Sequence, residues 1–205
     1  MVKRTDIKQR ILDAALKLAE ESSWEEIRLS DIATELDISL LEIQKHFSQK
    51  DELVEAWFDR ADQAMLQLTQ NELSELALED RIIKIIFTWL DALAEHKTIT
   101  REMLWYKLEP LHVHLQIQGL LRISRTVQWI QELSRINAQY MKRIANELGL
   151  TSIYLCTFLY WLQDDSSEQK RTRVFLKRKL KCIQSCCCSL EKYFHSAKKP
   201  FKTAT

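Results

Sequence analysis

Five polar side chains between residues 39 and 50 have the chemistry to contact a nucleic acid. Glutamine can hydrogen-bond to the edge of adenine, whereas lysine and histidine can donate hydrogen bonds to phosphate oxygens. We therefore expect Gln44 to reach a base edge, and Lys45 and His46 to reach the sugar-phosphate backbone. The candidate DNA-contacting residues are Ser39, Gln44, Lys45, His46 and Lys50.

Two short helices and a tight turn are needed to position these side chains, and residues 29–53 carry that pattern. Ser39 stands where a helix N-cap belongs, and Glu42 three residues later completes a capping box. The segment therefore predicts a helix-turn-helix, a motif that places its second helix in a DNA major groove. Its apolar residues recur at helical spacing on both sides of the turn: Ile32, Ala33, Leu36, Ile38, Ile43 and Phe47.

The composition favours helices throughout the chain. The 205 residues include only 2 glycines and 2 prolines, so turns are few and long periodic segments are expected. The sequence thus predicts an all-α protein of about nine helices, with Gly149 as a helix stop. Outside the helix-turn-helix, helical patterns cover about residues 6–21, a long segment from 49, and then 80–96, 100–109, 112–135, 137–148, 151–164 and 170–195.

The sequence argues against a membrane-spanning protein, a secreted protein and an enzyme. It has no run of about 18 apolar residues and no apolar signal core near its start, which predicts a cytoplasmic location. No Ser-His-Asp, Cys-His or glycine-rich phosphate-binding pattern is present, so we expect neither catalysis nor a cofactor.

Histidines and cysteines in two segments have side chains that can bind metal ions. His112 and His114 diverge on a helix, which favours surface or structural roles. The cysteines at 182 and 186–188 lie in an amphipathic helical pattern, where burial as small apolar residues is favoured over zinc binding or redox sensing. We therefore expect no metal site.

Charge is distributed unevenly along the chain. Residues 1–60 contain 9 basic and 14 acidic residues, whereas residues 166–205 contain 11 basic and 2 acidic residues. DNA-binding domains gain most of their affinity by neutralising phosphates, so a net acidic N-terminal segment is unfavourable for DNA binding.

The first 60 residues resemble the N-terminal domain of TetR-type transcriptional regulators. The likeness rests on the first amphipathic segment, on DIATELDIS, and on HFSQKDEL, where His46, Phe47, Lys50 and Leu53 have the family's spacing. The resemblance implies an all-helical homodimer with a three-helix DNA-binding head and a larger helical domain for ligand binding and dimerisation. It divides the chain into a head over residues 1–50, a body over 51–195 and a flexible tail over 196–205.

Several positions of the head depart from the pattern of this family. Asp37 replaces the usual turn glycine, although aspartate tolerates the left-handed conformation better than most residues. Small or basic residues usually follow the serine, where this chain has Leu40, Leu41 and Glu42. Gln44 stands where the family usually has a phosphate-binding tyrosine. Glu42 would be repelled by phosphate, although a carboxylate can accept a hydrogen bond from cytosine.

The C-terminal half resembles a second family, the accessory proteins of ubiquinone biosynthesis. The likeness lies in SRTVQW at residues 124–129 and in WLQDDSSEQKRTRVFLKRKL at residues 161–180. It implies a TetR-like fold that binds an isoprenoid lipid and helps a hydroxylase to reach its substrate. Since both resemblances imply the same fold, they differ only in what the fold does.

A hydrophobic small molecule or lipid is the expected ligand of the body. Large aromatic residues are frequent between residues 89 and 161, and a cavity between helices of this kind suits an apolar ligand held by a few polar anchors. The candidate ligand-contacting residues are Trp105, His112, Arg125, Gln128, Trp129 and Trp161.

The last helical segment allows two interpretations. The favoured one is a homodimer contact, because TetR-type dimers pack their last two helices into a four-helix bundle. The alternative is a membrane-surface helix, since each basic residue near an anionic leaflet contributes about 1 kcal/mol. The apolar seam consists of Leu176, Leu180, Ile183, Cys187, Leu190 and Phe194.

The leading hypothesis is a ligand-responsive regulator that binds a double-stranded DNA operator as a homodimer. Residues 39–46 would enter the major groove, and Lys50 would hold a phosphate at the start of the next helix. The alternative is a non-enzymatic lipid-binding accessory protein of ubiquinone biosynthesis that keeps a relic helix-turn-helix.

Overall fold

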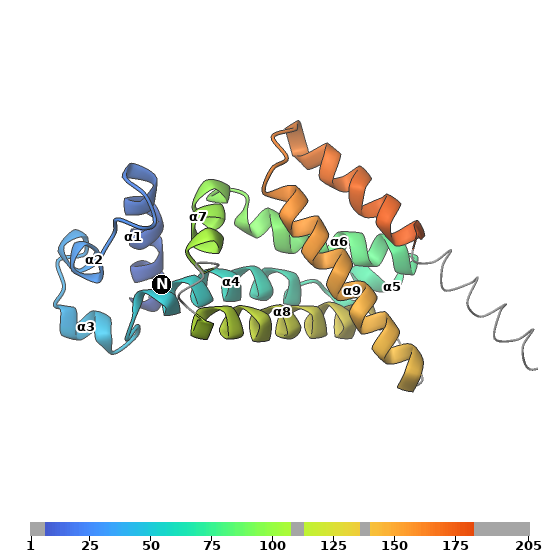
Figure 1. Ribbon diagram of the computed structural model, residues 1–205, viewed down its shortest axis with the longest axis horizontal. Coiled ribbons are helices and arrows are strands. Elements are labelled where there is room, and N and C mark those ends of the chain that lie inside the picture. Colours follow the sequence, from blue (N-terminus) through green and yellow to red (C-terminus); the bar gives the residue numbers. More distant parts are fainter. Residues whose placement is uncertain (1–6, 108–112, 136–139, 183–205) are drawn as a thin grey trace, which may run out of the picture.

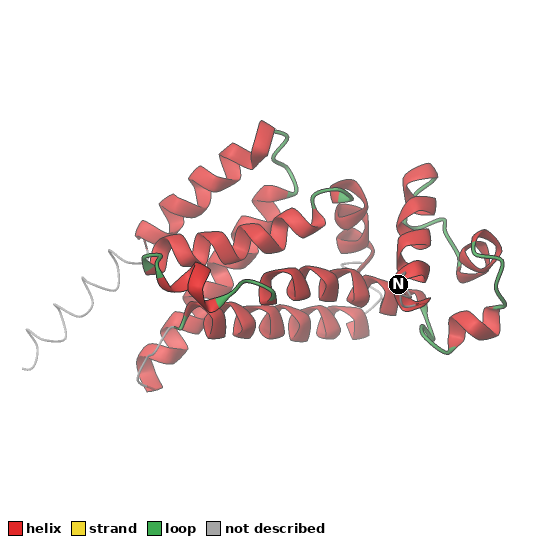
Figure 2. Ribbon diagram, turned by 180° about the vertical axis from the view of Figure 1, so that it is seen from behind, coloured by secondary structure: helices red, strands yellow, loops and turns green. Residues whose placement is uncertain are grey.

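The computed structural model describes residues 7–107, 113–135 and 140–182. Within these ranges every regular element is helical, as the sequence predicted (Figure 1 and Figure 2). In chain order the elements are α1 (Ile7–Glu21), α2 (Leu29–Glu35), α3 (Leu40–Gln44), α4 (Lys50–Leu66), α5 (Gln70–Ser74), α6 (Leu78–Leu93), α7 (Lys97–Lys107), α8 (Val113–Ser134), α9 (Tyr140–Trp161) and the 3-10 helix η1 (Ser167–Gln169). Residues 170–182 form a last helical segment.

Helices α1, α2 and α3 form the head, which lies at one end of the molecule (Figure 1). Each contributes an isoleucine to a common core, and Ile11, Ile32 and Ile43 are each at most 1% exposed. Trp24, in the connection between α1 and α2, is fully buried with them. Burying each such side chain contributes about 1.5–3 kcal/mol, which is how three short helices hold together.

The body is built along α4, which leaves the head and runs beside α8, with α6 and α9 against them (Figure 1). Trp89 of α6 lies at the centre of its core. The rings of Tyr154 and Phe158 meet it edge-on with centroids 5.3 Å away, and Phe58 stacks on it at 6.0 Å. Most of the large aromatic side chains near Trp89 are therefore core.

The predicted helix break at Gly149 is wrong, because α9 continues without interruption from Tyr140 to Trp161. A glycine in a helix interior costs about 1 kcal/mol relative to alanine. Burial of Leu150, Ile153 and Tyr154 on the following turn offsets this cost. The short helix α5 was not predicted, although Thr69 and Glu72 form its capping box.

The polar turn between α9 and the last helical segment is organised by Asp164. Its carboxylate accepts hydrogen bonds from the backbone N–H of Ser166 at 2.9 Å and of Thr172 at 2.8 Å, and from the Thr172 hydroxyl at 2.6 Å. Although burial opposes ionisation, these hydrogen bonds hold the pKa of Asp164 well below its usual range. Asp164 thus caps the helical segment that follows.

Residues 170–182 pack partly against the body. Leu176 and Leu180 are buried, and the Arg173 guanidinium lies 4.0 Å from the centre of the Phe87 ring. The first two positions of the predicted seam are therefore covered within the chain, whereas Val174 is 49% exposed. The other four seam positions, and the cysteines at 186–188, lie outside the described residues; Cys182 is exposed. None of the helices in the described ranges has the length and apolarity of a membrane span.

Candidate nucleic-acid interface and its junction with the body

The turn of the helix-turn-helix is formed by Asp37, which adopts a left-handed conformation with φ of 52°. The backbone N–H of Ile38 donates to the carbonyl of Ala33 at 3.0 Å, and that of Asp37 to the carbonyl of Thr34 at 3.2 Å. These two bonds form a Schellman motif, which ends α2 and turns the chain toward α3. Aspartate thus performs the role of the glycine that is usual in the related turn.

Helix α3 begins at the predicted N-cap but lacks half of the predicted capping box. The Ser39 hydroxyl accepts the backbone N–H of Glu42 at 3.1 Å. The Glu42 side chain instead lies 2.6 Å from the Lys45 ammonium and 3.7 Å from Nε2 of His46. The hydrogen bond from Lys45 lowers the pKa of Glu42. The Glu42 carboxylate of α3 therefore lies beside two of the predicted DNA contacts.

The outer face of α3 is open to solvent but is not rich in DNA-reading groups. Leu40 and Leu41 are 54% and 64% exposed, and Gln44 and Lys45 are also exposed. Ile43 points the other way, into the head. The outer face of α3 is thus formed largely by two leucines, with Gln44 and Lys45 beside them.

Lys50 lies inside the junction between head and body. Its ammonium donates to the backbone carbonyls of Glu25 at 3.0 Å and Ile27 at 2.8 Å, and it lies 5.2 Å from the Trp24 ring centre and 5.7 Å from that of Tyr106. Burial lowers the pKa of Lys50. Two of its three donors are thus used to fasten the connection before α2 to the start of α4, which sequence reasoning missed.

Further hydrogen bonds join the head to the segment around α7. The backbone N–H of Trp24 donates to Glu102 at 2.7 Å, and Nδ1 of His96 lies 2.7 Å from the Glu20 carboxylate. The head is therefore held by α4 and α7 together, so a shift between these two helices would change its orientation.

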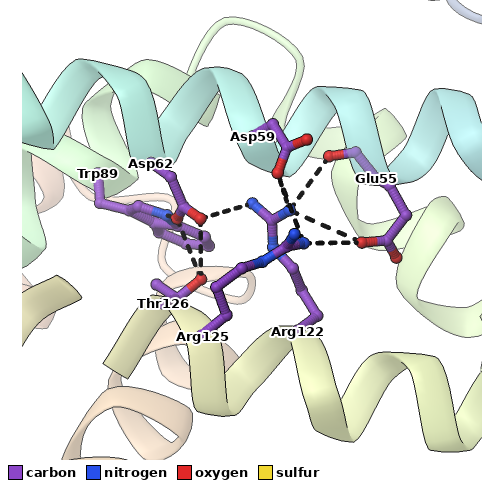
Figure 3. A network of polar contacts seen from close by, with 7 residues as sticks. All are labelled: Glu55, Asp59, Asp62, Trp89, Arg122, Arg125 and Thr126. Carbon is purple, nitrogen blue, oxygen red and sulfur yellow. Dashed lines mark hydrogen bonds and ion pairs between the residues drawn. The ribbon is translucent and has the colours of Figure 1, made fainter. Parts of the chain in front are cut away.

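A buried ion-pair network joins α4 to α8 a short distance from this junction (Figure 3). Arg122 of α8 is 7% exposed, and its guanidinium donates to Asp62 at 2.9 Å and to Asp59. Glu55 lies 3.7 Å from Arg122 and 3.4 Å from Arg125. The α4 carboxylates thus face the α8 guanidinium groups along the contact.

Asp62 is the innermost member of this network. It accepts hydrogen bonds from Nε1 of Trp89 at 2.8 Å and from the Thr126 hydroxyl at 3.0 Å. Burial raises the pKa of Asp62, and the charge of Arg122 opposes that rise. The network therefore links the α4–α8 contact to the aromatic core.

Sequence reasoning missed the network, although a signal was present. Glu55, Asp59 and Asp62 recur at helical spacing on α4, as Arg122 and Arg125 do on α8. A charged stripe usually marks a solvated face, and only the packing of the two helices shows that Asp62 and Arg122 are covered here.

The predicted ligand-contacting residues occupy different environments. Trp161 is fully buried in the core, whereas Trp105 and Trp129 are 65% and 41% exposed. Gln128 is exposed and Arg125 belongs to the network, while His112 lies outside the described residues. A pocket of about 360 Å³ lies between α4 and α8, and Arg125 is the member of the predicted set that lines it.

Comparison with known proteins finds two family resemblances in different parts of the chain. The model of the family "Bacterial regulatory proteins, tetR family" matches residues 11–57, and the COQ9 family model matches residues 129–186. No curated protein matches the chain.

Solved structures share the fold over most of the chain. The crystal structure of the TetR transcriptional regulator from Nitrosomonas europaea is 44% identical, covers 86% of this chain and 97% of its own, and superposes with a TM-score of 0.76. A TetR transcriptional regulator from Rhodococcus sp. RHA1 is 14% identical, covers 85% of this chain and 93% of its own, and has a TM-score of 0.62. The multidrug binding protein EbrR, complexed with imidazole, is 18% identical, covers 85% of this chain and 90% of its own, and has a TM-score of 0.56.

Proposed function

Since the chain belongs to the TetR family of bacterial regulatory proteins, we propose that it acts as a homodimeric, ligand-responsive transcriptional regulator that binds an operator through α3. The observation that carries this proposal is the complete helix-turn-helix geometry: the Schellman turn at Asp37, the N-cap at Ser39 and the exposed outer face of α3. Gln44 would read a base edge, and Lys45 and His46 would contact phosphates.

The proposed role of Lys50 differs from that of a simple phosphate ligand. Its ammonium keeps one donor beyond the two given to Glu25 and Ile27, so a phosphate could share it at the N-terminus of α4. The two hydrogen bonds from Lys50 also hold the head against the start of α4. Operator binding therefore depends on Lys50 through the orientation of the head as well as through contact.

Dimerisation would use the last two helices of the described chain. Leu148 and Leu159 of α9 and Val174 of the last segment are between 48% and 65% exposed, and Tyr160 is 38% exposed. A second copy would cover these side chains. The two-fold axis of such a dimer would relate its two heads, and each head would bind one half-site of an operator.

The direct test is fluorescence anisotropy with DNA from upstream of the coding region, against a scrambled duplex at several salt concentrations. An operator is expected to bind about a thousandfold more tightly than the scrambled duplex, with affinity that falls as salt rises. Gln44→Ala should weaken operator binding by about tenfold or more, and Lys170→Ala, on an exposed body side chain, should not. Equal binding to both duplexes would contradict the proposal.

A second candidate function is favoured by the match of the COQ9 family model to residues 129–186 and by the acidic head. Under it the chain is a non-enzymatic lipid-binding accessory protein of ubiquinone biosynthesis with a relic helix-turn-helix. Mass spectrometry of lipid extracted from the purified protein distinguishes the two. A stoichiometric isoprenoid together with no operator binding would replace the first proposal by the second.

A further inference from the structure

The pocket between α4 and α8 lies where the head meets the body. Its walls include Asp51, Glu52 and Glu55 from the first turns of α4, and Leu121, Arg122 and Arg125 from α8. Its volume of about 360 Å³ suits a small organic molecule. Figure 3 shows Glu55, Arg122 and Arg125, which belong both to this pocket and to the ion-pair network.

Asp51 is the most deeply buried of the three carboxylates of this wall, and the charge of Lys50, the preceding residue, acts on it. It is only 9% exposed, and its Oδ1 is buried with no hydrogen-bond partner in the described residues. Glu55 is paired with Arg125 at 3.4 Å, and Glu52 accepts the backbone N–H of Ser48 at 2.8 Å. Buried polar atoms are rarely left without a hydrogen bond, so Oδ1 of Asp51 indicates an N–H donor that is supplied from outside the chain.

The other groups of the pocket agree with a cation on a small apolar frame. Three carboxylates and two guanidinium groups line the pocket, and Arg122 already donates to Asp59 and Asp62. Leu121 is 65% exposed and supplies an apolar wall. An anion would have to displace carboxylates from both arginines, and it would still leave Oδ1 of Asp51 without a hydrogen-bond donor.

We propose that this pocket binds a small organic cation with N–H donors, such as an amidinium or a primary ammonium, through Asp51. The N–H groups would bond to the Asp51 carboxylate, and the apolar part would lie against Leu121. The cation would also approach Glu55, and it would compete with Arg125 for that carboxylate.

A regulatory consequence rests on the proposed operator binding. Asp51 directly follows Lys50, whose ammonium holds the connection before α2. A ligand on Asp51 therefore acts on the first turn of α4, between the head and the α4–α8 network. Its occupancy would change the orientation of the head, and with it the affinity for DNA.

Isothermal titration of the full chain with benzamidinium tests the site, because this probe joins an amidinium to one ring. Neutral benzamide, of nearly the same shape, is the matched control ligand. Saturable binding of benzamidinium is expected, with benzamide at least about tenfold weaker, since hydrogen bonds to charged groups are the stronger ones. No saturable binding of benzamidinium, or equal binding of benzamide, would overturn the proposal.

Two variants place the binding in the pocket. Asp51→Asn should weaken benzamidinium binding by about tenfold or more, and Asp165→Asn, on a side chain that is 99% exposed, should not. Leu121→Lys should also weaken benzamidinium binding, because it brings a positive charge close to the cationic ligand. Leu121 is exposed, so this second variant still tests the site if Asp51→Asn fails to fold. Unchanged binding by Asp51→Asn or by Leu121→Lys would refute the site.

The same probe in the DNA anisotropy assay separates this site from the proposed function. Asp51-dependent binding of benzamidinium in a protein that recognises no operator would keep the site and reject the regulator. Operator binding in a protein that does not bind benzamidinium would keep the regulator and reject the site.

Discussion

The ammonium of Lys45 lies 2.6 Å from Oε2 of Glu42, one helical turn earlier on the recognition helix. A phosphate that approaches Lys45 must compete with this carboxylate, which also lies near His46. The pair is exposed to solvent and can separate readily. Glu42 would therefore weaken the attraction between Lys45 and a DNA phosphate.

Removing the carboxylate should strengthen DNA binding. Glu42→Gln releases Lys45 and removes a repulsive charge, so affinity for both specific and scrambled duplexes should rise, and the slope of log K against log salt should steepen by about one. Anisotropy titrations over a salt series measure both quantities. Glu168→Gln, on an 81% exposed side chain, is the control, and an unchanged slope would show that Glu42 does not limit phosphate contact by Lys45.

Replacing Lys50 should lower stability in the absence of DNA. Lys50→Ala removes two hydrogen bonds to carbonyls of the α1–α2 connection and the contacts with Trp24 and Tyr106, so the free energy of unfolding should fall by about 1–3 kcal/mol. Urea denaturation followed by circular dichroism measures this change. Lys45→Ala, which breaks only an exposed ion pair, should cost less than about 1 kcal/mol. Equal effects of the two variants would refute the structural role of Lys50.

The Asp164 cap should make the protein sensitive to acid. Its pKa in the folded state lies below the ordinary value of 3.8, so its stabilising contribution is complete above that value and is lost as the pH falls through the folded pKa. At neutral pH, Asp164→Asn should lower the free energy of unfolding by about 2–3 kcal/mol. The difference between wild type and variant should shrink below about pH 4; a difference that is constant with pH would contradict this account.

Loss of Arg122 should be more damaging than loss of its exposed neighbour. Arg122→Met leaves Asp62 and Asp59 without their buried counter-charge and should cost about 3–5 kcal/mol. Arg125→Met, on a side chain that is 50% exposed, should cost less than about 1 kcal/mol. Calorimetry of thermal unfolding measures the stability of the two variants. The double variant Arg122→Met/Asp62→Asn should recover part of the stability that Arg122→Met loses, because the buried charge of Asp62 is removed as well. Similar costs for both single variants would show that the network contributes little.

Local patterns predicted the helix-turn-helix well, because its signals lie within a few residues of one another. The N-cap at Ser39 and the left-handed turn at Asp37 were both predicted and are both present. The continuity of α9 through Gly149 could not be read locally, since it depends on contacts with distant helices.

The partners of individual side chains could not be predicted from the sequence either. Lys50 has the type and position of a phosphate ligand, and only the fold reveals that two backbone carbonyls lie within its reach. The α4–α8 network had the same difficulty, because the charges that pair in it are about 60 residues apart. The ligand-contacting set in the body remains a prediction for the same reason.

The separation of charge between the two ends gives the molecule a permanent electric dipole. The head is acidic, whereas residues 170–182, away from the head in Figure 1, carry seven lysines and arginines and no acid. In the field of a polyanion this dipole experiences a torque that turns the basic end forward. At low ionic strength the protein should therefore approach DNA with residues 170–182 in front and the head behind. Screening over about 8 Å at physiological salt weakens that torque, so moderate salt should speed productive encounter even as it weakens the final complex.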